Sequence, residues 1–221
     1  MSILFVLLTF LLILTYSYFR RGDSPAVAVQ PARFQNITAP VMLKVTGFDV
    51  PADYGFHPGH TWARDEGRQN ARVGIDGFAG NLIGDVDSIE MADLNRWVRQ
   101  GQKLCTFKKG EKSVDVLSPV EGVLVSINHE VVKNPKLLME DPYKNGWLGV
   151  VKAPELSINL KNLLQGPLVP SWMQNSYSQL SGMMQQVTPA LAQDGGLPVK
   201  GLYFQVDDKV QRKLAKEFFM S

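Results

Sequence analysis

The sequence has few of the residues that build cross-links and most metal centres. It contains one cysteine, Cys105, and three histidines among 221 residues. A single cysteine excludes an intramolecular disulfide and a cysteine-rich zinc site. Three histidines leave little room for a histidine-based metal centre. No metal site is therefore predicted.

The sequence also lacks a strong charge of either sign. Lysine and arginine number 23 and aspartate and glutamate 21, which gives a net charge of +2. Nucleic-acid-binding domains normally carry a basic patch or stripe, so nucleic acid is not a predicted partner. The composition, 45% apolar and 20% charged, excludes a wholly disordered chain and a multi-span membrane protein. The length fits one domain with extensions, or two small domains.

Charge is absent altogether from residues 3–19, which form the longest apolar run. Such a run approaches the length needed to span a bilayer, and Arg20 and Arg21 follow it at once. We predict a transmembrane helix as an anchor over residues 1–21. A cleaved signal peptide is the alternative, but its charges normally precede the apolar stretch. The positive-inside rule then predicts a single-pass protein of the inner or cytoplasmic membrane, with its soluble domain in the cytoplasm.

Residues 22–52 are predicted as a linker, because Pro25, Pro31 and Pro40 lie there among small and polar residues. From residue 53 to 164 short apolar runs alternate with Gly, Asp, Asn and Pro, which predicts a small β barrel or sandwich. The predicted strands are 71–75, 86–91, 103–108, 114–117, 121–127 and 147–152. Two short helices are expected between them, at 77–83 after the N-cap Asp76 and at 136–139.

Residues 165–221 are predicted as a C-terminal extension that ends in a helix. Asp207 or Asp208 is placed to cap this helix, and its apolar face combines Val210, Leu214, Phe218 and Phe219. The face can dock on the chain's own domain, on a partner or on a membrane surface. Docking on its own domain is the favoured interpretation.

The central segment carries a series of landmarks in a fixed order. His60-Thr61-Trp62 comes first, and Val73-Gly74-Ile75-Asp76 follows. From His60 to about Leu164 the chain resembles the H protein of the glycine cleavage system. The other matching landmarks are Gly84, Asp85, Pro119, Gly122, Asn128, Asp141, Pro142, Tyr143, Gly146 and Trp147.

The resemblance implies a mainly β fold, a lipoyl-like barrel-sandwich hybrid with short helices. It implies a carrier rather than an enzyme, with lipoate as the cofactor on a lysine of an exposed hairpin. The implied partners are glycine decarboxylase, aminomethyltransferase and dihydrolipoyl dehydrogenase. No paired carboxylates, catalytic triad or phosphate loop stands out elsewhere in the sequence.

The hairpin departs from the family at its most important residue. The family's lipoyl lysine lies eight residues before the proline that matches Pro119, and that position is Glu111. Glutamate has no amine with which to form the lipoyl amide. Lys112 becomes the candidate attachment site if the alignment slips by one residue. The predicted hairpin tip is Lys109, Gly110, Glu111 and Lys112, whose other interpretation is a solvated basic turn.

Three functions compete at this stage. The first is a membrane-anchored H-like interaction module without lipoate. The second is an anchored carrier lipoylated on Lys112. A membrane-fusion adaptor is the third, but its long helical hairpin does not fit between Cys105 and Pro119.

Overall fold

The computed structural model describes residues 9, 11, 13, 15, 41–187 and 200–221. The chain divides into a unit of residues 1–38 and a unit of residues 39–221, and the second contains every element described below. Across the described ranges, no helix combines the length and apolar character needed to cross a membrane. Most of the predicted anchor, and the predicted linker up to residue 40, lie outside these ranges.

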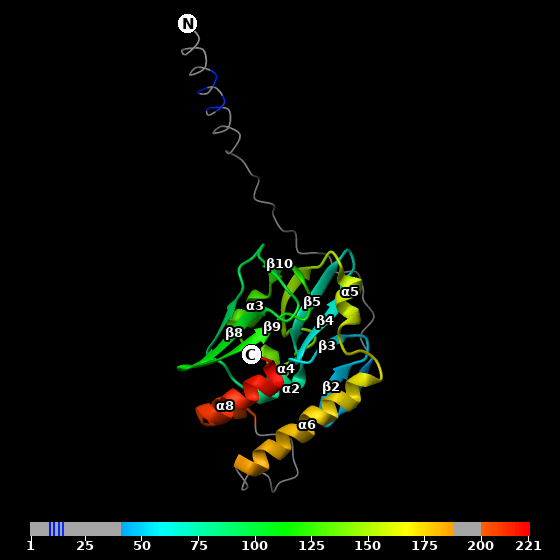
Figure 1. Cartoon of the computed structure of the whole chain (residues 1–221), viewed down its shortest axis with the longest axis vertical. Coiled ribbons are helices and arrows are strands. Elements are labelled where there is room, and N and C mark those ends of the chain that lie inside the picture. The colour runs from blue at the N-terminus through cyan, green and yellow to red at the C-terminus, as the bar shows by residue number, and fades with distance from the viewer. Residues whose placement is uncertain (1–8, 10, 12, 14, 16–40, 188–199) are drawn as a thin grey trace. The chain divides into compact units, whose positions relative to one another are not determined.

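Two antiparallel sheets form the body of the second unit (Figure 1). The larger has the order β3-β4-β5-β11-β10-β7 and the smaller the order β6-β8-β9. Buried side chains of both sheets, among them Trp62, Phe107 and Leu124, belong to one hydrophobic core. The strands are β3 Gly55–His57, β4 Thr61–Asp65, β5 Asn70–Ile75, β6 Ser88–Met91, β7 Trp97–Val98, β8 Lys103–Lys109, β9 Lys112–Leu117, β10 Gly122–Ile127 and β11 Trp147–Lys152. The prediction of a mainly β fold with short helices is confirmed.

Short helices connect the strands at the places where capping residues occur. Asp76 caps α2 (Gly77–Ile83) by accepting a hydrogen bond from the backbone N–H of Ala79 at 2.8 Å, as predicted. Asn128 caps α3 (His129–Lys133) in the same way. The remaining short helices are α4 (Leu137–Glu140) and α5 (Leu156–Lys161).

The predicted linker is wrong for residues 42–51, which form a β-hairpin. Strands β1 (Met42–Val45) and β2 (Phe48–Pro51) pair through a turn at Thr46 and Gly47, both with positive φ. Two-residue hairpin turns of this kind match the twist of the strands. Phe48 anchors the hairpin, because its ring packs edge-on against Phe78 of α2. The sequence interpretation gave too much weight to the nearby prolines and overlooked this local signal.

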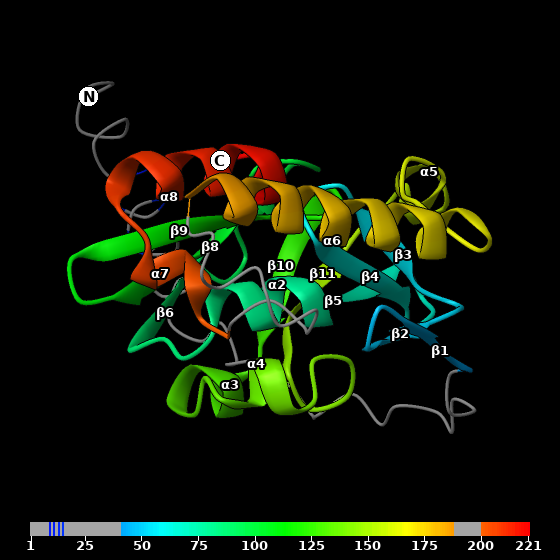
Figure 2. The same cartoon turned by 90° about the horizontal axis from the view of Figure 1, so that it is seen from below.

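The C-terminal extension packs on its own domain, which confirms the favoured interpretation. Its elements are α6 (Leu168–Val187), α7 (Leu202–Gln205), α8 (Asp208–Leu214) and the π-helical turn η2 (Ala215–Phe219). Figures 1 and 2 show α6 and α8 on the same side of the sheets. The predicted apolar face of the last helix is right, since Val210, Leu214, Phe218 and Phe219 are all buried.

Helix α6 was not predicted as a helix. Its buried residues nevertheless recur at helical spacing: Val169, Met173, Ser176, Leu180 and Met184. Pro170 lies in the first turn, where a helix tolerates it. Glycine, serine and glutamine in this stretch hid the periodicity.

Candidate functional site

The predicted hairpin is formed by β8 and β9. Residues pair one to one from Cys105–Val116 to Lys109–Lys112, and Gly110 and Glu111 make the turn. Gly110 has φ +56°, the conformation that a two-residue turn requires at its first central position and that glycine adopts without strain. The unbroken register leaves Glu111 as the second turn residue and Lys112 as the first residue of β9.

Glu111 is exposed at the tip, whereas the ammonium of Lys112 is engaged by the C-terminal extension. Lys112 Nζ donates to the backbone oxygen of Val206 at 2.6 Å and to that of Phe204 at 3.5 Å. A carboxylate oxygen of Asp208 lies 3.9 Å away, and the Lys112 side chain remains 32% exposed. Hydrogen bonds from a charged donor are among the strong ones, so Lys112 joins the hairpin to the α7–α8 segment.

Two further hydrogen bonds hold the hairpin in place. The backbone N–H of Gly110 donates to a carboxylate oxygen of Asp87 at 2.8 Å. On the flank, the hydroxyl of Tyr203 donates to the backbone oxygen of Ser113 at 3.3 Å. Burial, together with the nearby charge of Asp115, raises the pKa of Tyr203 to about 12. Tyr203 therefore stays protonated and remains a donor at neutral pH.

The tip does not fit the lipoate that the resemblance implies. Lipoate is attached as an amide, which needs a free lysine amine at the turn. Glu111 offers a carboxylate there, and the nearest amine, that of Lys112, is hydrogen-bonded to Val206 and Phe204. Lys109 is exposed but lies on β8, before the turn.

The lone cysteine lies within the same hairpin but away from its tip. Cys105 is buried opposite Val116. Burial raises the pKa of its thiol, and the nearby Asp115 acts in the same direction. A thiol that stays protonated is a poor nucleophile, so Cys105 is a packing residue.

The first landmark, His60, forms a buried pair with Asp76. His60 Nδ1 and a carboxylate oxygen of Asp76 are 2.8 Å apart, and both side chains are almost fully buried. The imidazole stacks on Phe78 and on Trp172, with ring centroids 4.4 and 4.5 Å apart. Since Trp172 belongs to α6, the pair also joins the extension to the β domain.

The remaining landmarks shape the backbone. The indole N–H of Trp62 donates to the backbone oxygen of Ile75 at 2.8 Å. Gly84 has φ +68° and lies close to Gly201 of the extension. A Cβ on Gly84 would be only 2.4 Å from the Cα of Gly201. Pro119, Gly122 and Gly146 are buried, whereas Asp85 is exposed. These landmark residues therefore have roles in the fold, and none of them is placed to carry out a reaction.

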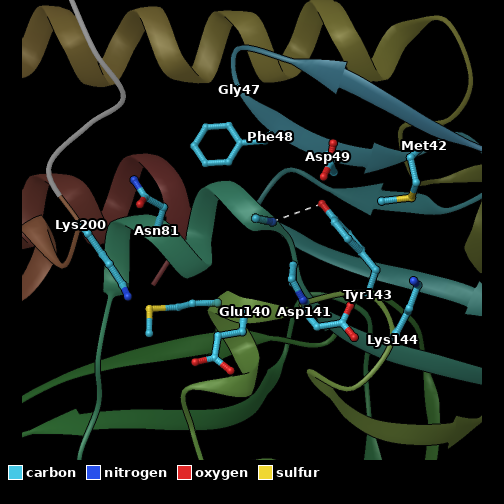
Figure 3. A pocket seen from close by; sticks show the side chains of 13 residues that line it. Met42, Gly47, Phe48, Asp49, Asn81, Glu140, Asp141, Tyr143, Lys144 and Lys200 are labelled. Atoms are coloured by element: carbon cyan, nitrogen blue, oxygen red, sulfur yellow. Dashed lines mark hydrogen bonds between the residues drawn. The ribbon is translucent and has the colours of Figure 1, made fainter.

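The block around Tyr143 lines a cavity of about 500 Å³ (Figure 3). The backbone N–H of Gly77 donates to the Tyr143 hydroxyl at 3.2 Å, the dashed line in Figure 3. Burial raises the pKa of Tyr143 well above its usual value. Pro142 also lines the cavity, as do charged side chains of both signs: Asp49, Glu140, Asp141, Lys144 and Lys200.

Mixed charge around this cavity selects no single class of ligand. Asp49 and Lys200 were not predicted as site residues, because Asp49 lies in the β1–β2 hairpin and Lys200 in the extension. The contacts of Lys112 were missed for a similar reason, since Val206 is 94 residues away in sequence. Within the described ranges no cluster of three or more His, Cys, Asp or Glu residues is arranged to hold a metal.

Comparisons with known proteins point to one family. The family model described as glycine cleavage H-protein matches residues 55–175. The glycine cleavage system H protein of Aliivibrio salmonicida is 32% identical over 114 residues, which cover 52% of this chain and 90% of that protein. That of Idiomarina loihiensis is 34% identical over 116 residues, covering 52% and 89%.

A solved structure gives a weaker likeness. The crystal structure of a glycine cleavage system H protein from Mycobacterium marinum matches with a TM-score of 0.44 and 24% identity. The match covers 48% of this chain and 87% of that one.

Proposed function

The chain belongs to the glycine cleavage H-protein family, and from this premise we propose that it is a membrane-anchored interaction module whose hairpin carries no lipoate. Family members are lipoyl carriers and not catalysts, and this chain is likewise not an enzyme.

The hairpin tip is the observation that carries the proposal. Glu111 occupies the turn, and the ammonium of Lys112 donates to two backbone oxygens of the extension. An amide on Lys112 would remove the positive charge and place an acyl chain where Val206 and Phe204 lie. The α7–α8 segment would also stand beside any arm that had to enter a partner's active site.

Anchoring is the second part of the proposal. The uncharged run of residues 3–19, followed by Arg20 and Arg21, supports a single-pass anchor with the domain in the cytoplasm. An anchor confines the domain to a thin layer and raises its effective concentration for partners at that membrane. A soluble shuttle between enzymes has no need of such confinement.

The competing function is a carrier lipoylated on Lys112. It draws support from the exposure of about a third of the Lys112 side chain and from its place beside the turn. In that case glycine decarboxylase, aminomethyltransferase and dihydrolipoyl dehydrogenase become its partners.

Mass spectrometry of the protein purified from its native host separates the two functions. We expect the peptide spanning residues 104–117 to be unmodified, while other lipoyl proteins of the same cells carry lipoate. The variant Glu111→Lys restores an amine at the turn and is expected to gain a lipoyl group on residue 111. Combining it with Lys112→Arg assigns the modified residue without ambiguity.

A lipoyl group on Lys112 of the unaltered protein would overturn the proposal. Lys109→Arg is the matched control, since Lys109 is an exposed hairpin lysine outside the turn. In Lys109→Arg the modification state of residues 111 and 112 should be the same as in the unaltered protein.

A further inference from the structure

The last helix presents a row of cations to solvent. Lys209, Arg212, Lys213 and Lys216 are all exposed. They occur at helical spacings of three, four and seven residues, which places them on one side of α8–η2. The opposite side is buried against the domain through Val210, Leu214, Phe218 and Phe219. We call the four cations the basic face.

No acidic side chain of the described ranges forms an ion pair with the basic face. Two acidic residues occur on α8–η2. Asp208 lies 3.9 Å from the ammonium of Lys112, and Glu217 is in η2. Cations near a helix C-terminus stabilise it through the helix dipole. That effect accounts for Arg212 and Lys213 in the last turn of α8, but not for Lys209 in its first turn.

The hairpin tip extends the charge. Lys109 pairs directly with Lys112 across the strands, so both side chains lie on the same face of the ribbon. Lys112 in turn contacts Val206, which ends α7, and Asp208, the first residue of α8. Exposed Lys109 is therefore the cross-strand neighbour of the residue that contacts Asp208 at the start of α8.

We propose that the basic face docks on the anionic headgroups of a phospholipid bilayer. Charge complementarity supports this occupant, because lysine and arginine side chains near a membrane surface are attracted by anionic lipids. The cations stand on the outer ridge of a helix, a shape that suits the plane of a bilayer. This inference rests on the proposed anchor, which keeps the domain close to a membrane.

The length of chain before the domain permits this contact. Residues 20–40 span up to roughly 70 Å when extended, whereas a domain of this size is about 40 Å across. Any face of the domain can therefore reach the bilayer, and the charge distribution decides which face does.

Energy transfer between a label and the lipids tests the proposal on the full chain. The variant Ser221→Cys takes a donor fluorophore after the end of η2. The dye labels this cysteine selectively, because Cys105 is buried. The chain is reconstituted into vesicles of phosphatidylcholine alone, or with phosphatidylglycerol added, and acceptors are placed on the headgroups. We expect higher transfer in the anionic vesicles and loss of the difference at high salt.

Charge removal makes the test specific to one surface. The triple variant Lys209→Gln, Arg212→Gln, Lys213→Gln should weaken docking by on the order of a hundredfold, since each cation contributes about fivefold. The control Lys136→Gln, Lys152→Gln, Lys161→Gln removes the same charge from exposed positions elsewhere and should keep the difference. Circular dichroism verifies that each variant is folded.

Equal transfer in both vesicle types, or equal effects of the two triple variants, would overturn the proposal. Either result would favour an acidic protein as the occupant of the basic face. Failure of the anchor is measured separately, as release from phosphatidylcholine vesicles by alkaline carbonate. A chain released in this way still tests the basic face, through its flotation with anionic vesicles.

Discussion

At the scale of single residues, two histidines three positions apart have different surroundings. His57 accepts a hydrogen bond at Nδ1 from the backbone N–H of Gly59 at 3.0 Å, which requires that nitrogen to be unprotonated. His60 faces the carboxylate of Asp76 instead. Burial lowers the pKa of His57 below its usual 6.5, and the nearby His60 lowers it further.

The lowered pKa of His57 makes stability dependent on pH. The unfolded chain binds a proton at His57 more readily than the folded chain, so the contribution is present above about pH 6.5 and is lost as pH falls through the lower, folded pKa. We expect the urea concentration at the unfolding midpoint to decrease when the pH is lowered from 7 to 5. In His57→Asn that fall should be smaller, while the exposed His129→Gln should behave as the unaltered protein. An identical pH profile for His57→Asn would contradict this.

Lys112 offers a second prediction at this scale. In Lys112→Met, two backbone oxygens of the extension lose their charged donor. We expect a loss of about 1.5–3 kcal/mol in the free energy of unfolding. Amide hydrogen exchange should increase in residues 200–210, where those oxygens lie. Lys109→Met is the matched control, because Lys109 makes no such contact with the described residues of the extension. Equal exchange in both variants would refute the role assigned to Lys112.

At the scale of elements, α6 is integral to the core. Met173 of α6 is fully buried, and the neighbouring Trp172 stacks on His60. Met173→Ala leaves a cavity and should cost about 2–5 kcal/mol in the free energy of unfolding. Gln174→Ala changes the next, exposed residue of the same helix and should be nearly neutral. If both variants unfold at the same urea concentration, α6 is only loosely attached.

Local signals explain which elements the sequence predicted. The N-cap Asp76 was identified correctly, and of the two candidates Asp207 and Asp208 the structure uses Asp207. Such caps can be read from the sequence because a cap depends on residues two or three positions away. Alternating runs gave β5, β8, β9, β10 and β11 for the same reason. The contacts of Lys112 with Phe204 and Val206 could not be foreseen, because the extension meets the hairpin only after the whole chain has folded. The place of Glu111 at the tip followed from the resemblance to the H-protein family, whose lipoyl lysine lies eight residues before the proline that matches Pro119.

At the scale of the whole molecule, the proposed anchor predicts how the chain partitions. Membranes from cells that express the full chain should retain it after alkaline carbonate, which removes peripheral proteins but leaves spanning helices in place. Replacing Leu7, Leu8 and Leu11 with arginine should release it, since each charge in the middle of the apolar run is costly. Retention of the arginine variant would show that another segment holds the chain on the membrane.

The β1–β2 hairpin gives the chain a mechanical property. The strands are paired at Met42–Pro51, the end at which the chain both enters and leaves the ribbon. A pull at residue 40 therefore loads the cross-strand pairs one after another, from Met42–Pro51 toward Val45–Phe48, and not all at once. Opening the ribbon lengthens the chain by roughly 33 Å. Because β1 and β2 form a sheet of their own, tension on residue 40 reaches this ribbon before it reaches the sheet that carries the β8–β9 hairpin.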